Sequence, residues 1–186
     1  MGDDPLQKAF ASTRAVLAAI GPDALGDSTP CRSWTVGELI NHTIAAPRVG
    51  AHMLLGQEPP ADDIDFAAGD FVAAYDESVT VTLDAFAVPG VLEKTVQLPF
   101  AEVPGAFLRQ MITTDQFTHG WDLARATGQP TDLAPGVAER LLAVAKMSLP
   151  DAMRGPDGQA PFGPAVVVAD DAPAADRLAG FMGRTV

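Results

Sequence analysis

Apolar residues recur every three to four positions along most of the chain, and this spacing predicts a mainly helical protein. The expected helices cover residues 5–20, 36–56, 66–87, 104–128, 135–149 and 172–181. Residues 91–103 alternate partly between apolar and polar side chains and contain Pro99, so they predict a hairpin or a long extended crossover. We therefore expect a mainly all-α fold with one short extended interruption.

The helix at 36–56 has the clearest start signal in the sequence. Thr35 and Glu38 fit a capping box, in which the hydroxyl and the carboxylate each bind the other residue's backbone amide. Pro47 lies inside the helix, where it removes one backbone donor and crowds the carbonyl of Thr43.

The helix at 104–128 carries polar side chains on its apolar face. Asp115, His119 and Asp122 continue the line that Leu108 and Ile112 define as facing the core. A buried carboxylate is costly unless it is paired, so these two acids need partners. Residues four apart on a helix lie side by side, and Asp115 and His119 could therefore bind one divalent ion. The same pattern also fits a hydrogen-bonded pair without a metal.

Histidines are scarce, which limits the choice of a third metal ligand to His42 or His52. The two lie about 80° apart on an ideal helical wheel, so both are not expected to reach one ion. His42, Asp115 and His119 together would leave a coordination position open, as in catalytic rather than structural zinc sites. His52 is then expected at the surface or at the rim of the site.

Composition narrows the class of partner. The 186 residues include 12 Lys or Arg and 24 Asp or Glu, giving a formal charge of −12. This balance argues against nucleic acid or an anionic membrane as the main partner, because both favour clustered cations. Cys31 is the only cysteine, so an intramolecular disulfide is excluded and we expect a small buried residue there. No secretory signal or membrane-spanning run is visible, so a cytoplasmic protein is expected.

Three segments resemble one known family. Residues 29–42 (TPCRSWTVGELINH) and 115–128 (DQFTHGWDLARATG) are similar to the two signatures of the mycothiol-dependent maleylpyruvate isomerase N-terminal domain family. The ending at 178–184 (LAGFMGR) is similar to that of its small stand-alone actinobacterial members. The family belongs to the DinB-like superfamily of metal-binding helical bundles.

The resemblance implies a four-helix bundle that holds one divalent metal on His42, Asp115 and His119. The metal is usually zinc, and nickel, manganese or iron also suit these donors. The isomerase has Glu where this chain has Asp115, a side chain shorter by one methylene. The isomerase also has a larger C-terminal domain, which residues 129–186 are too few to match, so the isomerisation itself is not carried over. We expect residues 1–128 to form the bundle and residues 129–186 to form a helical extension packed on it.

The function that the resemblance implies is a thiol-dependent transferase or isomerase-like detoxification enzyme. Mycothiol, the low-molecular-weight thiol co-substrate, would bind the metal as a thiolate and attack an electrophilic small molecule. Asp122 would orient a ligand histidine. Arg125 would contact an acidic group of the substrate or thiol, or else be a solvated cation at the helix end.

Two alternatives remain open at this point. One is a non-catalytic ligand-binding or stress-response module with the same metal-dependent pocket, and the other is a bundle whose polar cluster only fixes the helix register. We also expect a homodimer, because Leu83, Phe86, Val137, Leu141 and Val144 offer more apolar helix surface than a four-helix core needs.

Overall fold

The computed structural model describes residues 4–31, 34–61, 64–98, 101–156, 159–160 and 162–186. Within these ranges the helices are α1 (Pro5–Leu17), α2 (Val36–Leu55), α3 (Phe71–Ala87), α4 (Gly105–Ala126), α5 (Pro135–Ser148) and α6 (Ala174–Phe181). Strands β1 (Thr95–Gln97) and β2 (Glu102–Pro104) form a small antiparallel hairpin between α3 and α4. The mainly all-α fold is confirmed.

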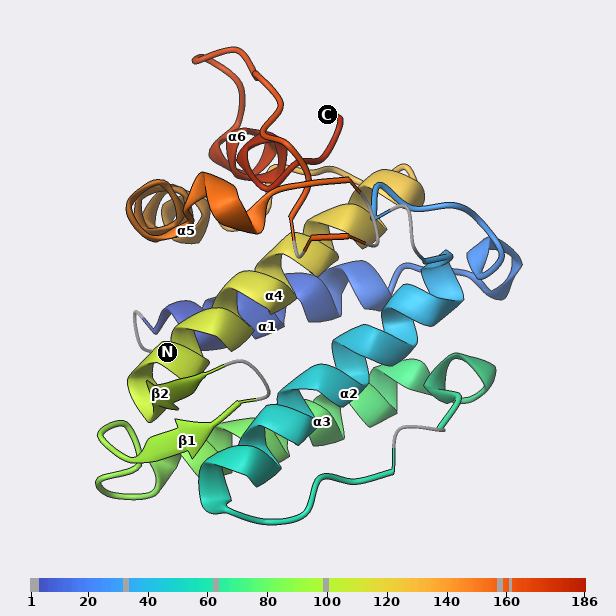
Figure 1. The fold of residues 1–186 in the computed structure, drawn as a ribbon. Helices are drawn as coiled ribbons and strands as arrows, with labels where there is room; N and C mark the ends of the chain where they lie inside the picture. Colours follow the sequence, from blue (N-terminus) through green and yellow to red (C-terminus); the bar gives the residue numbers. More distant parts are fainter. Residues whose placement is uncertain (1–3, 32–33, 62–63, 99–100, 157–158, 161) are drawn as a thin grey trace.

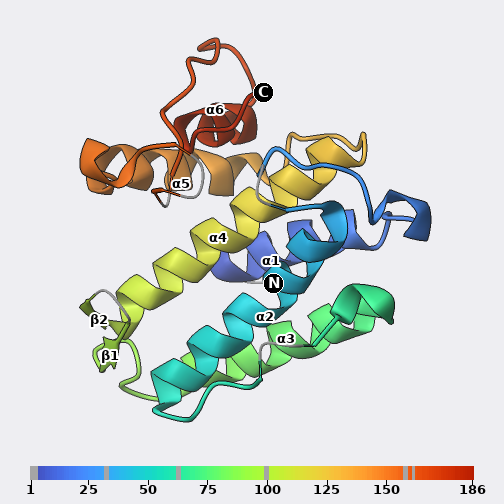
Figure 2. The ribbon, with the colours of Figure 1, turned by 45° about the vertical axis from the view of Figure 1, so that its right-hand side comes forward.

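Helices α1 to α4 form the bundle, in which α1 lies along α4 and α2 packs against both α3 and α4 (Figures 1 and 2). One apolar cluster with members from all four helices and the hairpin fills its interior. Helices α5 and α6 pack against each other on the opposite side of α4 (Figure 1). Helix α4 is therefore the central element, covered from two sides.

Most predicted helices are shorter in the structure, for local reasons. Residues 66–68 form a separate 3₁₀ turn, and α3 starts anew where the Asp70 carboxylate accepts the Ala73 amide. Helix α6 begins after Pro173, and α4 starts after Pro104. Residues 91–93 form turns, so among the described residues of the predicted segment 91–103 only the hairpin strands are extended. Pro99 of that segment, and Arg32 and Ser33 of the first signature, lie outside the described residues.

The predicted capping box of α2 is present: the Thr35 amide donates to the Glu38 carboxylate, and the Glu38 amide donates to the Thr35 hydroxyl. The helix continues through Pro47. Because proline has no N–H, the carbonyl of Thr43 lacks its usual helical donor, and Gln116 Nε2 of α4 donates to it at 3.0 Å. The proline thus creates an acceptor by which α2 binds α4.

The second half of α4 differs from the predicted single apolar face. Nearly every residue from Gln116 to Ala124 is buried, because the bundle covers one side and the extension covers the other. Gly120 lies where α1 comes closest, and any side chain there would collide with Thr13. This close approach lets the Thr13 hydroxyl donate to the Gln116 carbonyl at 2.8 Å.

A second apolar cluster joins the extension to the bundle. Phe117 and Trp121 of α4 are buried among side chains of α5 and α6, and Trp121 Nε1 donates to Asp176. Val137 and Leu141 belong to this cluster, so part of the surface behind the homodimer prediction is covered within one chain. The homodimer and a domain boundary at residue 128 stay predictions. No helix in the described ranges is long and apolar enough to cross a membrane.

Candidate metal centre

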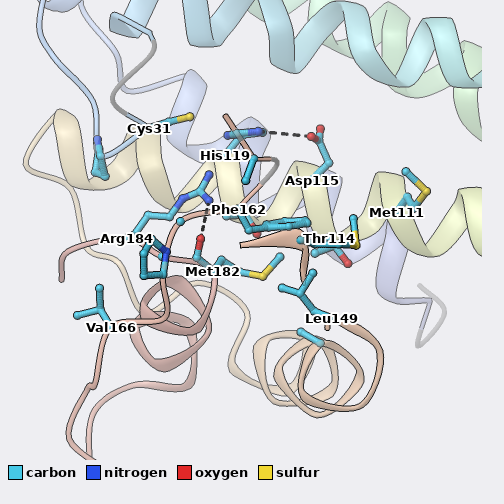
Figure 3. Close-up of a pocket in the computed structure, with 18 of the residues that line it drawn as sticks. Cys31, Met111, Thr114, Asp115, His119, Leu149, Phe162, Val166, Met182 and Arg184 are labelled. Carbon is cyan, nitrogen blue, oxygen red and sulfur yellow. Dashed lines mark hydrogen bonds and ion pairs between the residues drawn. The ribbon is translucent and has the colours of Figure 1, made fainter. Parts of the chain in front are cut away.

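The three residues predicted to bind metal lie together at the wall of a cavity. His42 comes from the second turn of α2, and Asp115 and His119 lie one turn apart on α4. His42 Nε2 is 3.2 Å from Asp115 Oδ1, and His119 Nε2 is 3.4 Å from the same oxygen. Figure 3 shows His119 and Asp115 on the same side of the cavity. Two helices that are distant in sequence thus bring three metal-ligating side chains within 4.8 Å of one another.

The residues present fit a divalent ion. Two ligand atoms at about 2.0–2.1 Å from a tetrahedral zinc are about 3.3–3.4 Å apart, close to the separations of both histidines from Asp115. Two imidazole nitrogens and one carboxylate oxygen are donors that zinc and its neighbours accept. His119 Nδ1 lies 3.1 Å from Asp122 Oδ2, and a proton on Nδ1 leaves Nε2 of the neutral ring free to bind a metal.

Asp122 is fully buried, and a residue that the sequence did not point to balances its charge. Arg184, just beyond α6, donates from Nη2 to Asp122 Oδ2 at 3.0 Å and from Nε to Oδ1 at 3.2 Å. Arg184 is the last residue of the segment 178–184 that resembles the family, and this resemblance was the one sequence feature that could have pointed to it. Its pairing across 62 positions could not be predicted without the fold.

These contacts shift the pKa values of the cluster. Burial alone would raise the pKa of Asp115, but His119 and His42 outweigh it and hold this pKa well below its usual range. The pKa of Asp122 is also lowered, because His119 and Arg184 outweigh the effect of its burial. Burial would lower the pKa of His119, yet the two carboxylates raise it to about 9. The cluster without metal therefore alternates negative and positive charges.

A buried network of hydrogen bonds around Gln116 lies next to Asp115. Gln116, fully buried, accepts a hydrogen bond from the Tyr75 hydroxyl at 2.8 Å and donates to the Thr43 carbonyl. Its amide nitrogen also lies 3.4 Å from Asp115 Oδ2. The network therefore ties α2, α3 and α4 together beside two of the candidate ligands.

The loop before α2 supplies two further residues. The Trp34 ring stacks on His42 with centroids 4.5 Å apart and meets His119 edge-on at 5.6 Å. Cys31 is half-buried and lines the cavity, so the prediction of a small buried residue there is wrong. Its sulfur lies within 4.8 Å of ligand atoms of His119 and Asp122, which makes a second group of potential donors.

The cavity has a volume of about 900 Å³ and lies between bundle and extension. The cavity is lined from the bundle side by Pro30, Cys31, Trp34, His42 and α4. It is lined from the other side by α5, by described residues between 153 and 166, and by residues 182–185. The extension therefore forms much of the wall that faces the candidate ligands (Figure 3).

Two residues that the sequence placed at or near the site, His52 and Arg125, do not line this cavity. His52 lies in the last turn of α2, and its Nδ1 is 3.0 Å from the Glu58 carbonyl. Arg125 is exposed in the last turn of α4 and is not among the residues that line the cavity. Among the described arginines, Arg184 rather than Arg125 contacts the cluster.

Comparisons with known proteins agree with the resemblance. A family model described as the mycothiol maleylpyruvate isomerase N-terminal domain matches residues 6–124, which include the three candidate ligands and Asp122. Two uncharacterised proteins from strains of Mycobacterium tuberculosis are each 41% identical over 187 residues, covering 98% of this chain and 99% of the relative. No solved structure matches. The chain therefore belongs to the family of the mycothiol maleylpyruvate isomerase N-terminal domain.

Proposed function

We propose that this protein is a metal- and thiol-dependent transferase that acts on an electrophilic small molecule. The observation that carries the proposal is the convergence of His42, Asp115 and His119 on the wall of a cavity of about 900 Å³. Membership of a mycothiol-related family supports mycothiol as the thiol.

Each residue of the cluster has a distinct task in this proposal. His42, Asp115 and His119 would hold one divalent ion, with zinc favoured by the donors. Asp122 fixes the His119 ring through Nδ1, and Arg184 keeps Asp122 ionised and in place. The Trp34 ring stacks on the His42 ring and so restricts its orientation.

The proposed reaction is a nucleophilic substitution by sulfur. A divalent ion bound there would lower the pKa of a coordinating thiol below its ordinary value of about 8.5, so that the thiolate would predominate at neutral pH. The thiol proton is released to solvent. A carbon–sulfur bond forms at the electrophilic carbon, and a leaving group such as chloride departs with its bonding pair.

The first experiment tests the metal site. Protein purified without chelator should contain close to one divalent ion per chain, and His42→Ala or His119→Ala should remove most of it. His52→Ala is the matched control, since His52 lies on the same helix as His42 but away from the cavity. Elemental analysis of folded protein measures the content. Metal retained in both site variants would refute the assignment, and loss in His52→Ala would mean that another histidine is the ligand.

The second experiment separates an enzyme from a binding module. Zinc-loaded protein should convert mycothiol and a chlorinated aromatic electrophile into the thioether faster than either the metal-free protein or His119→Ala. Metal and thiol binding without turnover would favour the non-catalytic ligand-binding alternative. Absence of metal binding would leave the polar cluster a structural feature only.

A further inference from the structure

The cavity is apolar over most of its surface. Its apolar lining comes from α4, α5, the loop after α5 and the segment after α6: Met111, Val144, Leu149, Met153, Phe162 and Met182. Its volume is within the range of about 300–1,000 Å³ typical of small-molecule sites. Methionine side chains are flexible and polarizable, so walls that contain three of them can adapt to several apolar shapes.

The charged groups that line the cavity form one connected row and are already paired. Arg184 binds Asp122, and Asp115 lies between His42 and His119. Figure 3 shows Cys31 and Arg184 toward one end of the cavity and Met111, Thr114 and Leu149 toward the other. A charged ligand body would lose its hydration among the apolar walls without gaining a partner. The walls therefore favour an uncharged, apolar body.

One buried hydroxyl in the wall lacks a partner. Thr118 is 4% exposed and lines the cavity, and its Oγ1 has no hydrogen-bond partner among the described residues. The neighbouring Thr114 hydroxyl instead donates to the Gln110 carbonyl one turn earlier. A buried hydroxyl without a partner is costly, and a ligand oxygen would satisfy it.

We propose that this cavity binds an amphiphilic small molecule, with an apolar body of aliphatic or aromatic carbon and one hydroxyl or carbonyl oxygen held by Thr118. The proposal rests on the proposed function in one respect: the electrophile that the thiol attacks would be a molecule of this class that also carries a leaving group. The body occupies the methionine-rich walls, and the oxygen-bearing end points toward the candidate metal ligands.

Straight-chain alcohols test the apolar part of the proposal on the full chain without metal. The dissociation constants of 1-hexanol, 1-octanol and 1-decanol, measured by calorimetry, should fall about threefold to fourfold with each added methylene. Val144→Glu should weaken 1-decanol binding at least tenfold. Met147→Glu is the matched control on the outer face of the same helix, where Met147 is 81% exposed, and should leave binding unchanged. Affinities that do not depend on chain length, or equal effects of both variants, would overturn the proposal.

Thr118 is tested with a variant of nearly the same shape. Thr118→Val should weaken every alcohol by a similar factor, about fivefold to tenfold, and keep the gain per methylene. Thr118→Ser should retain the affinity. Unchanged binding in Thr118→Val would overturn the role given to this hydroxyl. Because the alcohols bind without metal, failure of this series is distinguishable from failure of the metal site, which elemental analysis detects separately.

Discussion

At the scale of single residues, each charged side chain of the cluster is paired with a neighbour of opposite charge. Asp115 faces two histidines, and His119 links Asp115 to Asp122, which in turn meets Arg184. Removing one member of such a buried chain leaves a neighbour unpaired, which is more damaging than the loss of one contact at the surface. Residues that would not bind the ion themselves, such as Asp122 and Arg184, are therefore also expected to affect metal affinity.

Asp122→Asn should fold and weaken metal affinity by about 10–100-fold, the usual effect of losing a carboxylate that orients a ligand histidine. The amide keeps the shape of the side chain but holds the His119 proton less strongly. Titration against a competing chelator measures the affinity. An unchanged value would assign Asp122 to packing and to its pairing with Arg184 alone.

Metal affinity should also depend on pH through His119. Its pKa is raised to about 9 in the metal-free protein, so below that pH an ion must displace the His119 proton. Affinity should therefore fall by about tenfold for each pH unit between 8.5 and 6.5. Chelator competition at three pH values tests the slope. A flat profile would show that His119 binds no metal.

The three candidate ligands could be predicted because helical periodicity is local: Asp115 and His119 lie one turn apart, and few histidines were available to join them. Arg184, Gln116 and Thr118 could not. Their roles depend on which helix lies opposite, and that is set by packing rather than by spacing along the chain.

At the scale of elements, the backbone hydrogen bond that Pro47 removes from α2 is replaced by a hydrogen bond from α4. The position of the helix, its capping box and the missing donor of Pro47 were all readable from the sequence. That Gln116 of α4 would replace the donor was not, because it requires the α2–α4 packing. The end of α1 and the start of α3 were also predicted too far out. In α3 the reason is that Asp70 starts a new helix within an apolar pattern that otherwise continues.

A double-mutant cycle tests the link between α2 and α4. Gln116→Leu leaves the Thr43 carbonyl without a donor, whereas Pro47→Ala supplies a backbone N–H to that carbonyl. Gln116→Leu should therefore destabilise the Pro47→Ala protein less than the parent, by about 1 kcal/mol. Urea unfolding of the four proteins measures this coupling. Effects that add within about 0.5 kcal/mol would mean that Pro47 and Gln116 act independently.

At the scale of the whole molecule, the extension is part of the structure rather than an appendage. It buries Phe117 and Trp121 of the central helix, and it forms one wall of the cavity. The sequence predicted its helices and its packing on the bundle, but not the cavity. The cavity lies between the bundle and the extension, which were predicted separately. The sequence pattern of either one does not show where its surface meets the other.

A chain that ends at Gly128 should be much less stable than the full chain. It would expose Phe117 and Trp121, and we expect a thermal midpoint lower by more than about 10 °C together with binding of a hydrophobic dye. Calorimetry and dye fluorescence test this, with full-length Met147→Glu as a control for a harmless change in the extension. Unfolding at the same temperature as the full chain would show that residues 1–128 form a self-sufficient domain.

The placement of the donors along the chain has a consequence for the order of events during folding. Asp115 and His119 share one helical turn, whereas His42 is 73 positions away from Asp115. A chain with only α4 formed would already offer two donors, and the third arrives only when α2 docks. An ion that prefers three donors to two would then favour docking by mass action and slow its reversal. Ion capture would be the last step of assembly and would hold the two helices in register afterwards.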